Sequence, residues 1–248
     1  MNSNEIWSKR ATVFDKLEWV HTVAFLDLLI DSCGAREDFI ALDIGSGTGI
    51  ISTKLAPLVN RVTGIDISRE MIDEAVRKSQ DNPHANLSYI QMDAQQMNFP
   101  DDTFDLITAR MVFHHIDDVE KAMKASYRVL KKGGRLVLCE GVPPDHRTRK
   151  RYEEIFTLKE KRHTFSEAEL INLFHHTGFS HITLRPFFMS QVSLVNWLKN
   201  SSVEDEVAQQ ILELHLTADE HFKRVYRMSV NDNDIYIDWK FVIVVGEK

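Results

Sequence analysis

Short apolar segments alternate with amphipathic segments along most of the chain. The apolar segments predict strands at residues 41–44, 61–66, 87–92, 104–109, 135–140, 181–188 and 239–245. An alternation of strand and helix patterns builds a mostly parallel sheet with helices on both faces. We therefore expect an α/β fold with seven strands.

The amphipathic segments predict the helices between these strands. Apolar residues at helical spacing indicate a helix over 15–30, which Gly34 ends, and a long helix over 203–228. Ser166 and Glu169 form a capping-box pattern for a helix over 166–177 that Gly178 ends. Because hairpin loops are short, the roughly fifty residues 189–238 between the last two strands are an insertion.

A glycine-rich turn follows the first predicted strand. Gly45, Gly47 and Gly49 alternate there, so the backbone can turn tightly and approach a ligand, and the next helix begins with free N–H groups. Asp66 ends the following strand about 20 residues later, where a carboxylate can accept from both ribose hydroxyls. A nicotinamide-binding turn needs a small residue three positions after Gly47, but this chain has Ile50, which argues against an oxidoreductase.

From 41 to 142 the chain resembles the class I methyltransferases that use S-adenosylmethionine, in the branch of the quinone-biosynthesis and malonyl-carrier-protein enzymes. Four blocks in the expected order carry the resemblance. They are Asp43 with the glycines, Asp66, Asp93-Ala94, and the fourth strand at 104–110 together with a helix-turn-fifth-strand signature at 130–138. The resemblance implies a seven-stranded, mostly parallel Rossmann-like sheet whose last two strands are antiparallel, with an inserted helical lid.

The resemblance also implies S-adenosyl-L-methionine as cofactor and S-adenosyl-L-homocysteine as product. Asp66 is then the ribose ligand, Ile67 and Met71 flank the adenine, and Asp93 takes the adenine amino group. The expected cofactor-binding residues are Arg10, Asp43, Gly45, Gly47, Gly49, Asp66, Ile67, Met71, Asp93, Ala94 and Arg110. Taken one at a time, these acids also suit helix caps or turns.

The methyl acceptor is expected beyond the carboxyl ends of the fourth and fifth strands, where ligands of open α/β sheets bind. His114, His115 and Glu140 lie there and are the candidate catalytic residues, because each can be tuned to act as a base near neutral pH. A carboxylate acceptor would need no base, and each histidine also suits a solvated or capping role. Oxygen, nitrogen, carbon and sulfur all stay open as the acceptor atom, and no metal site is expected.

We expect one domain, 1–248, in four parts. Residues 1–40 form an N-terminal lid and helix, 41–142 the cofactor-binding core, and 143–165 and 189–238 the substrate-side insertions. In the lid, Phe14 stands where the family commonly has tyrosine, and Arg10 is a candidate for the ligand carboxylate. The first insertion carries the basic run 147–151 and further cations (Lys159, Lys161, Arg162, His163), diluted by glutamates. Such a run suits either an anionic or carrier-bound acceptor or a solvated helix face.

The composition limits which kinds of binding partner are expected. The net charge of −7 argues against an extended nucleic-acid groove, and the two cysteines, Cys33 and Cys139, suit buried thiols in a reducing compartment. No membrane span or signal segment is evident, so a cytoplasmic protein is expected. The leading hypothesis is methyl transfer to a small organic molecule. A tRNA or protein methyltransferase and a non-catalytic S-adenosylmethionine-binding partner are the alternatives, and the sequence indicates no oligomeric state.

Overall fold

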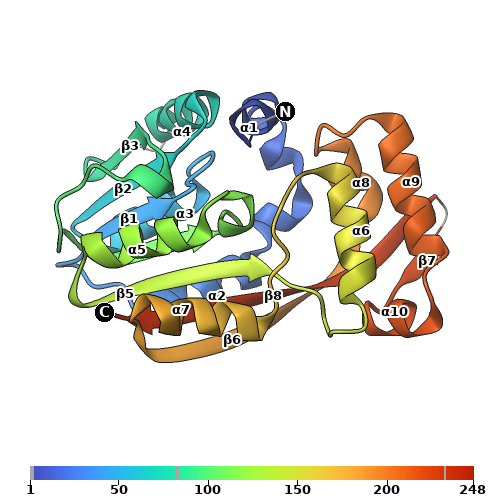
Figure 1. Ribbon diagram of the computed structural model, residues 1–248. Helices are drawn as coiled ribbons and strands as arrows, with labels where there is room; N and C mark the ends of the chain where they lie inside the picture. The colour runs from blue at the N-terminus through green and yellow to red at the C-terminus, as the bar shows by residue number, and fades with distance from the viewer. Residues whose placement is uncertain (1–2, 82–83, 232) are drawn as a thin grey trace.

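One sheet organises the structure, a computed structural model that describes residues 3–81, 84–231 and 233–248 (Figure 1). Its strand order is β3-β2-β1-β4-β5-β8-β6, and the short β7 pairs with β8. The strands are β1 Ile40–Ile44, β2 Arg61–Asp66, β3 Leu87–Gln91, β4 Phe104–Arg110, β5 Leu130–Gly141, β6 Ser180–Ser193, β7 Ser229–Asn231 and β8 Asp234–Glu247. The α-helices are α1 Ser3–Arg10, α2 Val23–Cys33, α3 Ile50–Leu55, α4 Arg69–Asp81, α5 Val119–Val129, α6 Arg149–Lys159, α7 Glu167–Thr177, α8 Leu194–Lys199, α9 Asp205–Leu216 and α10 Glu220–Val225.

The sheet is parallel from β3 to β5 and antiparallel at β8. β1 pairs in parallel with both β2 and β4, and β8 runs antiparallel between β5 and β6. This confirms the expected α/β class and the antiparallel last pair. Among the described residues there is one strand more than the seven expected, because 229–231 fold back onto the start of β8 as a hairpin.

Helices cover both faces of the sheet. On one face, Phe25 and Leu29 of α2 and Leu55 of α3 pack with the sheet residue Val137. On the other face, residues of α5 and α7 pack against Leu42 and Leu136. The centre of the sheet is therefore buried on both sides, as the apolar runs of the sequence require.

Two predicted helices are wrong in their extent. The helix expected over 15–30 is replaced by two 3₁₀ turns, Phe14–Lys16 and Glu18–His21, followed by α2. The turns place Leu17 and Val20 in the core that the inserted helices form with the start of β8. The helix expected over 203–228 is broken between α9 and α10, where the Asp219 side chain caps α10 by accepting from the Phe222 N–H.

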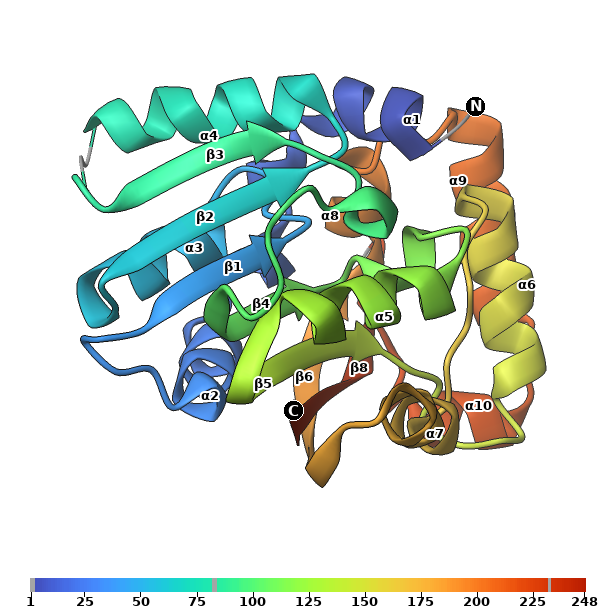
Figure 2. The same ribbon diagram turned by 60° about the vertical axis from the view of Figure 1, so that its left-hand side comes forward.

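The inserted segments gather beyond the carboxyl ends of the parallel strands (Figure 2), where α6, α8, α9 and α10 form a group of their own. Its buried core includes Ile155, Trp197, Ile211 and Phe222. The helix predicted over 166–177 is confirmed as α7, with its capping box and with Gly178 in the left-handed region. Across 3–81, 84–231 and 233–248, no helix is both long and apolar enough to cross a membrane.

Candidate active site

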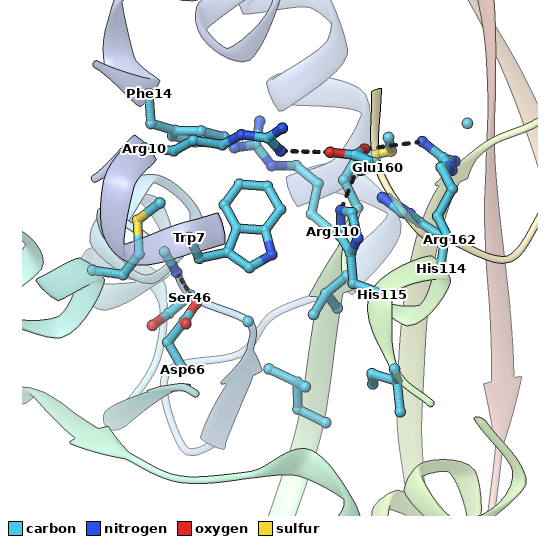
Figure 3. A pocket seen from close by; sticks show the side chains of 18 of the residues that line it. Trp7, Arg10, Phe14, Ser46, Asp66, Arg110, His114, His115, Glu160 and Arg162 are labelled. Carbon is cyan, nitrogen blue, oxygen red and sulfur yellow. Dashed lines mark hydrogen bonds and ion pairs between the residues drawn. The ribbon is translucent and has the colours of Figure 1, made fainter. Parts of the chain in front are cut away.

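A cavity of about 420 Å³ lies at the carboxyl ends of the parallel strands, between the sheet, the N-terminal segment and the inserted helices. It brings together most of the residues singled out from the sequence (Figure 3). Those that line it are Arg10, Asp43, Gly45, Gly47, Asp66, Ile67, Met71, Asp93, Ala94, Arg110, His114 and His115. Gly49 and Glu140 do not line the cavity and lie behind its wall.

The glycine-rich turn needs its glycines for different reasons. Gly45, Gly47 and Gly49 all have positive φ, which favours glycine. A Cβ on Gly49 would lie 2.3 Å from the Tyr89 Oη, so this glycine allows the turn to pack on β3. The nearest atom to a Cβ on Gly47 is 4.0 Å away, on Met71, so Gly47 keeps a surface open toward the cavity.

Two acids, Asp66 and the buried Asp43, stand beside this turn. Asp66 accepts hydrogen bonds from the Gly47 N–H and the Ser68 N–H, each at 2.9 Å, and burial raises its pKa. Asp43 accepts from the Ser52 hydroxyl at 2.6 Å and the Thr108 hydroxyl at 2.9 Å, and burial raises its pKa to about 6. Asp66 therefore holds the backbone of the turn, Asp43 joins the side chains of α3 and β4, and both acids line the cavity.

The residues that follow β3 form the part of the cavity expected to hold the adenine. Asp93 accepts from the Gln95 N–H at 2.8 Å and caps a 3₁₀ turn that begins at Ala94. Met71 is 1% exposed, whereas Ile67 is 37% exposed at the rim. An acid beside two apolar side chains suits an aromatic base with an exocyclic amino group.

These groups fit S-adenosylmethionine. The buried Ser46 hydroxyl lines the cavity and has no hydrogen-bond partner within the described parts of the chain, so it can serve a ligand. Asp66 would hold the ribose hydroxyls, Asp93 the adenine amino group, and Ile67 and Met71 the adenine faces. A positively charged, hydroxyl-bearing ligand suits acids that would repel a pyrophosphate.

The N-terminal segment closes one side of the cavity. Trp7 lies edge-on to His115, with ring centroids 4.9 Å apart, and 6.0 Å from Phe14. Figure 3 shows the Trp7 indole between Asp66 and His115. Arg110 donates to the Val20 carbonyl at 3.1 Å. The aromatic lid expected around Phe14 thus includes Trp7 as well.

Arg10 is paired within the protein, and its expected contact with the ligand carboxylate stays a prediction. Its Nη1 lies 2.5 Å from the Glu160 Oε2, and its Nε donates to the Ser201 carbonyl at 2.8 Å. The guanidinium therefore joins the lid to both inserted segments, while its side chain still lines the cavity.

His114 and Glu140 form a buried pair on the acceptor side. The His114 ring Nδ1 contacts one Glu140 oxygen, and the His114 backbone N–H donates to the other at 3.3 Å. Burial holds the pKa of His114 well below its usual value and raises the pKa of Glu140 to about 7. An ionised Glu140 accepts only from a protonated Nδ1, which leaves Nε2 with its lone pair.

Glu160 is the centre of a second buried cluster. The Lys159 Nζ lies 2.8 Å from it, and the Arg162 Nη1 and the His115 Nε2 lie 3.9 Å and 3.8 Å away. Burial opposes the charge of Glu160, but the surrounding cations dominate and hold its pKa well below its usual value. In the sequence Glu160 only dilutes a basic segment, so its buried central position could not be recognised there.

The same cluster bears on metal binding. Ligand atoms of His114, His115 and Glu160 lie within 4.8 Å of one another. Arg10, Lys159 and Arg162 surround the same carboxylate, and their charges repel a metal cation. The expectation of no metal therefore stays a prediction that the local charge supports.

The basic run of the first insertion divides in the structure. Arg149 pairs with Glu153 and Glu169, and Lys161 is 88% exposed beside Asp117. Lys159 and Arg162, in contrast, line the cavity. Trp197, Tyr226 and Trp239 of the C-terminal part line it too, and the sequence indicated them only as helix or strand residues.

The sheet order, the glycine turn, the acids at the ends of β1 and β2 and the acid after β3 are the features of a class I S-adenosylmethionine-dependent methyltransferase fold. Comparison with known proteins agrees. Residues 42–138 match the family model described as a methyltransferase domain. The comparisons together indicate a class I S-adenosylmethionine-dependent methyltransferase of the branch that resembles UbiE and YcgJ.

Curated relatives match about half of the chain. An uncharacterized methyltransferase, YcgJ of Bacillus subtilis, is 37% identical over 120 residues, 48% of this chain and 47% of that protein. A ubiquinone/menaquinone biosynthesis C-methyltransferase, UbiE of Pseudoalteromonas translucida, is 35% identical over 122 residues, 47% of this chain and 48% of its own. The chain thus spans about half the length of the curated relatives it matches.

Solved structures extend the likeness to most of the fold. The crystal structure of the Bacillus subtilis YcgJ protein has a TM-score of 0.83 at 26% identity and covers 90% of this chain and 97% of that one. A putative methyltransferase from Bacillus halodurans has a TM-score of 0.81 at 21% identity, covering 90% and 98%. The second comparison, at its low identity, concerns the fold alone.

Proposed function

We propose that the chain transfers a methyl group from S-adenosylmethionine to a small organic molecule held in the cavity. The main support for this proposal is that a single cavity is lined both by the expected donor residues Asp66 and Asp93 and by His114 and Glu160. Because 143–165 and 189–238 contribute its walls, a small acceptor fits better than a tRNA or a protein surface.

The donor side of the proposal rests on backbone geometry. When bound, S-adenosylmethionine supplies a methyl group on a positively charged sulfur. Asp66 keeps the glycine turn in its binding shape through the Gly47 N–H and presents the oxygens that a ribose needs. Asp43, held by Ser52 and Thr108, supports the same turn from the end of β1. Positioning of this kind can supply roughly 7–11 kcal/mol of a barrier.

The acceptor side offers a proton acceptor. The neutral His114 imidazole can take a proton from an oxygen, nitrogen or carbon acceptor at Nε2, and Glu140 stabilises the imidazolium that forms. His115 lies against Glu160 and Trp7, which suits a role in shaping the cavity. An acceptor that is already an anion would need no base and would only have to be aligned with the methyl group.

The name of the UbiE relatives suggests C-methylation of a quinone precursor as the finer alternative. The matched segment 42–138 includes the donor residues and the two histidines. It excludes Lys159, Glu160 and Arg162, which line the rest of the cavity. The likeness therefore supports the donor more than the acceptor.

The test begins with calorimetric binding of S-adenosylhomocysteine to wild type and Asp66→Ala. We expect at least tenfold weaker binding in the variant, because hydrogen bonds to a charged group contribute about 1.5–3 kcal/mol each. Asp73→Ala, which removes an exposed pair with Arg69, is the matched control and should bind normally. Absence of binding to wild type would overturn the cofactor assignment.

Transfer is then measured with methyl-labelled S-adenosylmethionine and a fractionated metabolite extract. Label that moves into a small-molecule fraction with wild type, but not with Asp66→Ala, supports the enzyme. Binding without transfer to small molecules, tRNA or protein would favour the non-catalytic partner instead.

A further inference from the structure

The charges around the cavity are unequally distributed. Acids line the donor end, at Asp43, Asp66 and Asp93. The opposite end is lined by Lys159 and Arg162, at and after the end of α6, together with Glu160 between them. A ligand that extends from the donor end toward these cations would meet an environment of opposite sign.

Arg162 is buried with its hydrogen-bonding capacity largely unused. Its side chain is 3% exposed, and its nearest carboxylate atom lies 3.9 Å away, on Glu160. Its Nη2 donates to the Tyr152 hydroxyl and its Nε to the His163 carbonyl, both at 3.4 Å. Good N–H···O bonds are near 2.9 Å, and a guanidinium has five N–H donors.

Arg10 provides the contrast within the same cluster. Its contacts to Glu160 and the Ser201 carbonyl are 2.5 Å and 2.8 Å long, as expected for a satisfied buried guanidinium. Buried polar groups are normally hydrogen-bonded, so the long contacts of Arg162 indicate a group that is completed by a ligand.

The cluster also has an excess of positive charge. Arg10, Lys159 and Arg162 face the single carboxylate of Glu160. Glu140 is the next carboxylate, and even with both glutamates ionised the three cations outnumber them by one. A buried charge without a partner is costly, and one further negative charge would balance this end of the cavity.

The walls beside Arg162 are aromatic. Its guanidinium lies 4.4 Å from the Phe156 ring centroid, and Lys159 lies 5.5 Å from that of Trp197. Tyr226 is 2% exposed and lines the cavity, with the Thr148 side chain near its hydroxyl. These surfaces suit an apolar or flat ligand body with a polar end.

We propose that Arg162 determines acceptor specificity by receiving the carboxylate of a methyl acceptor whose body is aromatic or otherwise apolar. This rests on the proposed function, since it names the acceptor class of the same cavity. The planar fork of arginine matches a carboxylate with two parallel hydrogen bonds, and a monoanion balances the excess charge. In the aromatic wall of the cavity, the Tyr226 hydroxyl is a further polar group that the acceptor could contact.

Matched acid and amide probes test this directly. The protein saturated with S-adenosylhomocysteine is titrated calorimetrically with benzoate, phenylacetate, cinnamate and octanoate, and with the primary amide of each. We expect at least one acid to bind wild type about tenfold more tightly than its amide, a difference of about 1.4 kcal/mol. In Arg162→Met that preference should be lost, and in Arg162→Lys it should fall at least threefold.

Arg149→Met is the matched control, because Arg149 pairs with Glu153 and Glu169 outside the cavity, and it should keep the full preference. Equal affinity of every acid and amide for wild type, or an unchanged preference in Arg162→Met, would overturn the proposal. If Arg162→Met also fails to bind S-adenosylhomocysteine, the proposal is judged on Arg162→Lys instead. An undiminished preference for acid over amide in Arg162→Lys would overturn the proposal. Normal S-adenosylhomocysteine binding without any acid preference refutes the carboxylate site alone and leaves the methyltransferase assignment intact.

Discussion

The Arg10 Nη1 lies 2.5 Å from the Glu160 Oε2, which joins the end of α1 to the residue after α6. Both side chains are buried, at 6% and 3% exposure. The two residues are separated by the whole of the cofactor-binding core in sequence, yet they meet over the cavity. This buried ion pair therefore joins the N-terminal lid to the first inserted segment, in addition to their apolar packing.

This relationship predicts unequal effects of its two partners. Glu160→Gln leaves three buried cations without their carboxylate, whereas Arg10→Met leaves Glu160 with Lys159 and Arg162. Breaking a buried pair costs about 3–5 kcal/mol when a charge is left alone. We expect Glu160→Gln to lower the free energy of unfolding by about this amount and Arg10→Met by less, as measured by urea denaturation.

Lys161→Met is the control for this pair of variants. Lys161 and its partner Asp117 are 88% and 76% exposed, so their ion pair contributes little and the variant should unfold like wild type. An Arg10→Met variant less stable than Glu160→Gln would contradict the central position given to Glu160.

The glycine turn allows ligand binding and packing to be separated. Gly47→Ala places a Cβ in open space on the cavity side, although its φ of 52° adds strain. We expect at least tenfold weaker S-adenosylhomocysteine binding with a loss of stability of about 1–2 kcal/mol. Gly49→Ala drives a Cβ to 2.3 Å from the Tyr89 Oη and should destabilise the fold more.

Calorimetry and thermal denaturation of both variants check this contrast. Gly133→Ala is the matched control, since Gly133 has a φ of 74° and no atom near its Cβ position, so it carries strain alone. Normal ligand affinity in Gly47→Ala would show that the open surface at this glycine does not face the cofactor.

Burial of Asp43 predicts a pH-dependent contribution to stability. Its pKa rises from 3.8 to about 6 on folding, so the folded state binds the proton more tightly than the unfolded state. The resulting stabilisation is complete below pH 3.8 and is lost as the pH rises through about 6. The difference in unfolding free energy between wild type and Asp43→Asn should therefore decline by roughly 1–3 kcal/mol over this window.

Urea denaturation of both proteins at several pH values between 4 and 7 measures this difference. Subtraction of the Asp43→Asn curve removes the contributions of the other titrating groups. A difference that stays constant with pH, or that grows as the pH rises, would contradict a buried, proton-retaining Asp43.

The sequence predicted the parts of the fold that depend on local pattern. β2 begins and ends at the residues expected, and the α7 capping box is present because its hydrogen bonds are formed by neighbours in the chain. The helix expected over 15–30 begins only at Val23, since Leu17 and Val20 pack into a core built largely by residues of the inserted helices. Periodicity shows that a residue is buried, but not against which element.

The donor side of the cavity could likewise be predicted from local sequence, whereas much of the acceptor side could not. Asp66 and the glycines follow a spacing fixed by one strand, one turn and one helix, so the sequence brings them together. Glu160 follows α6, Trp197 lies in α8 and Tyr226 follows α10, so these residues converge on the cavity only through tertiary packing. No local signal distinguishes such a glutamate from an exposed one.

The pair of His114 and Glu140 predicts a pH profile for methyl transfer to an acceptor that must lose a proton. The pKa of Glu140 is raised to about 7, so below this pH the neutral acid no longer stabilises a charged His114. With the acceptor found by the labelled-donor assay, wild-type kcat should fall as the pH drops below about 7. Glu140→Gln should lower kcat roughly 10²-fold, the lower range for acid–base catalysis, and abolish the inflection. The control variant Glu153→Gln, which changes an exposed partner of Arg149, should keep the inflection. An inflection that persists in Glu140→Gln would assign the titration to another group.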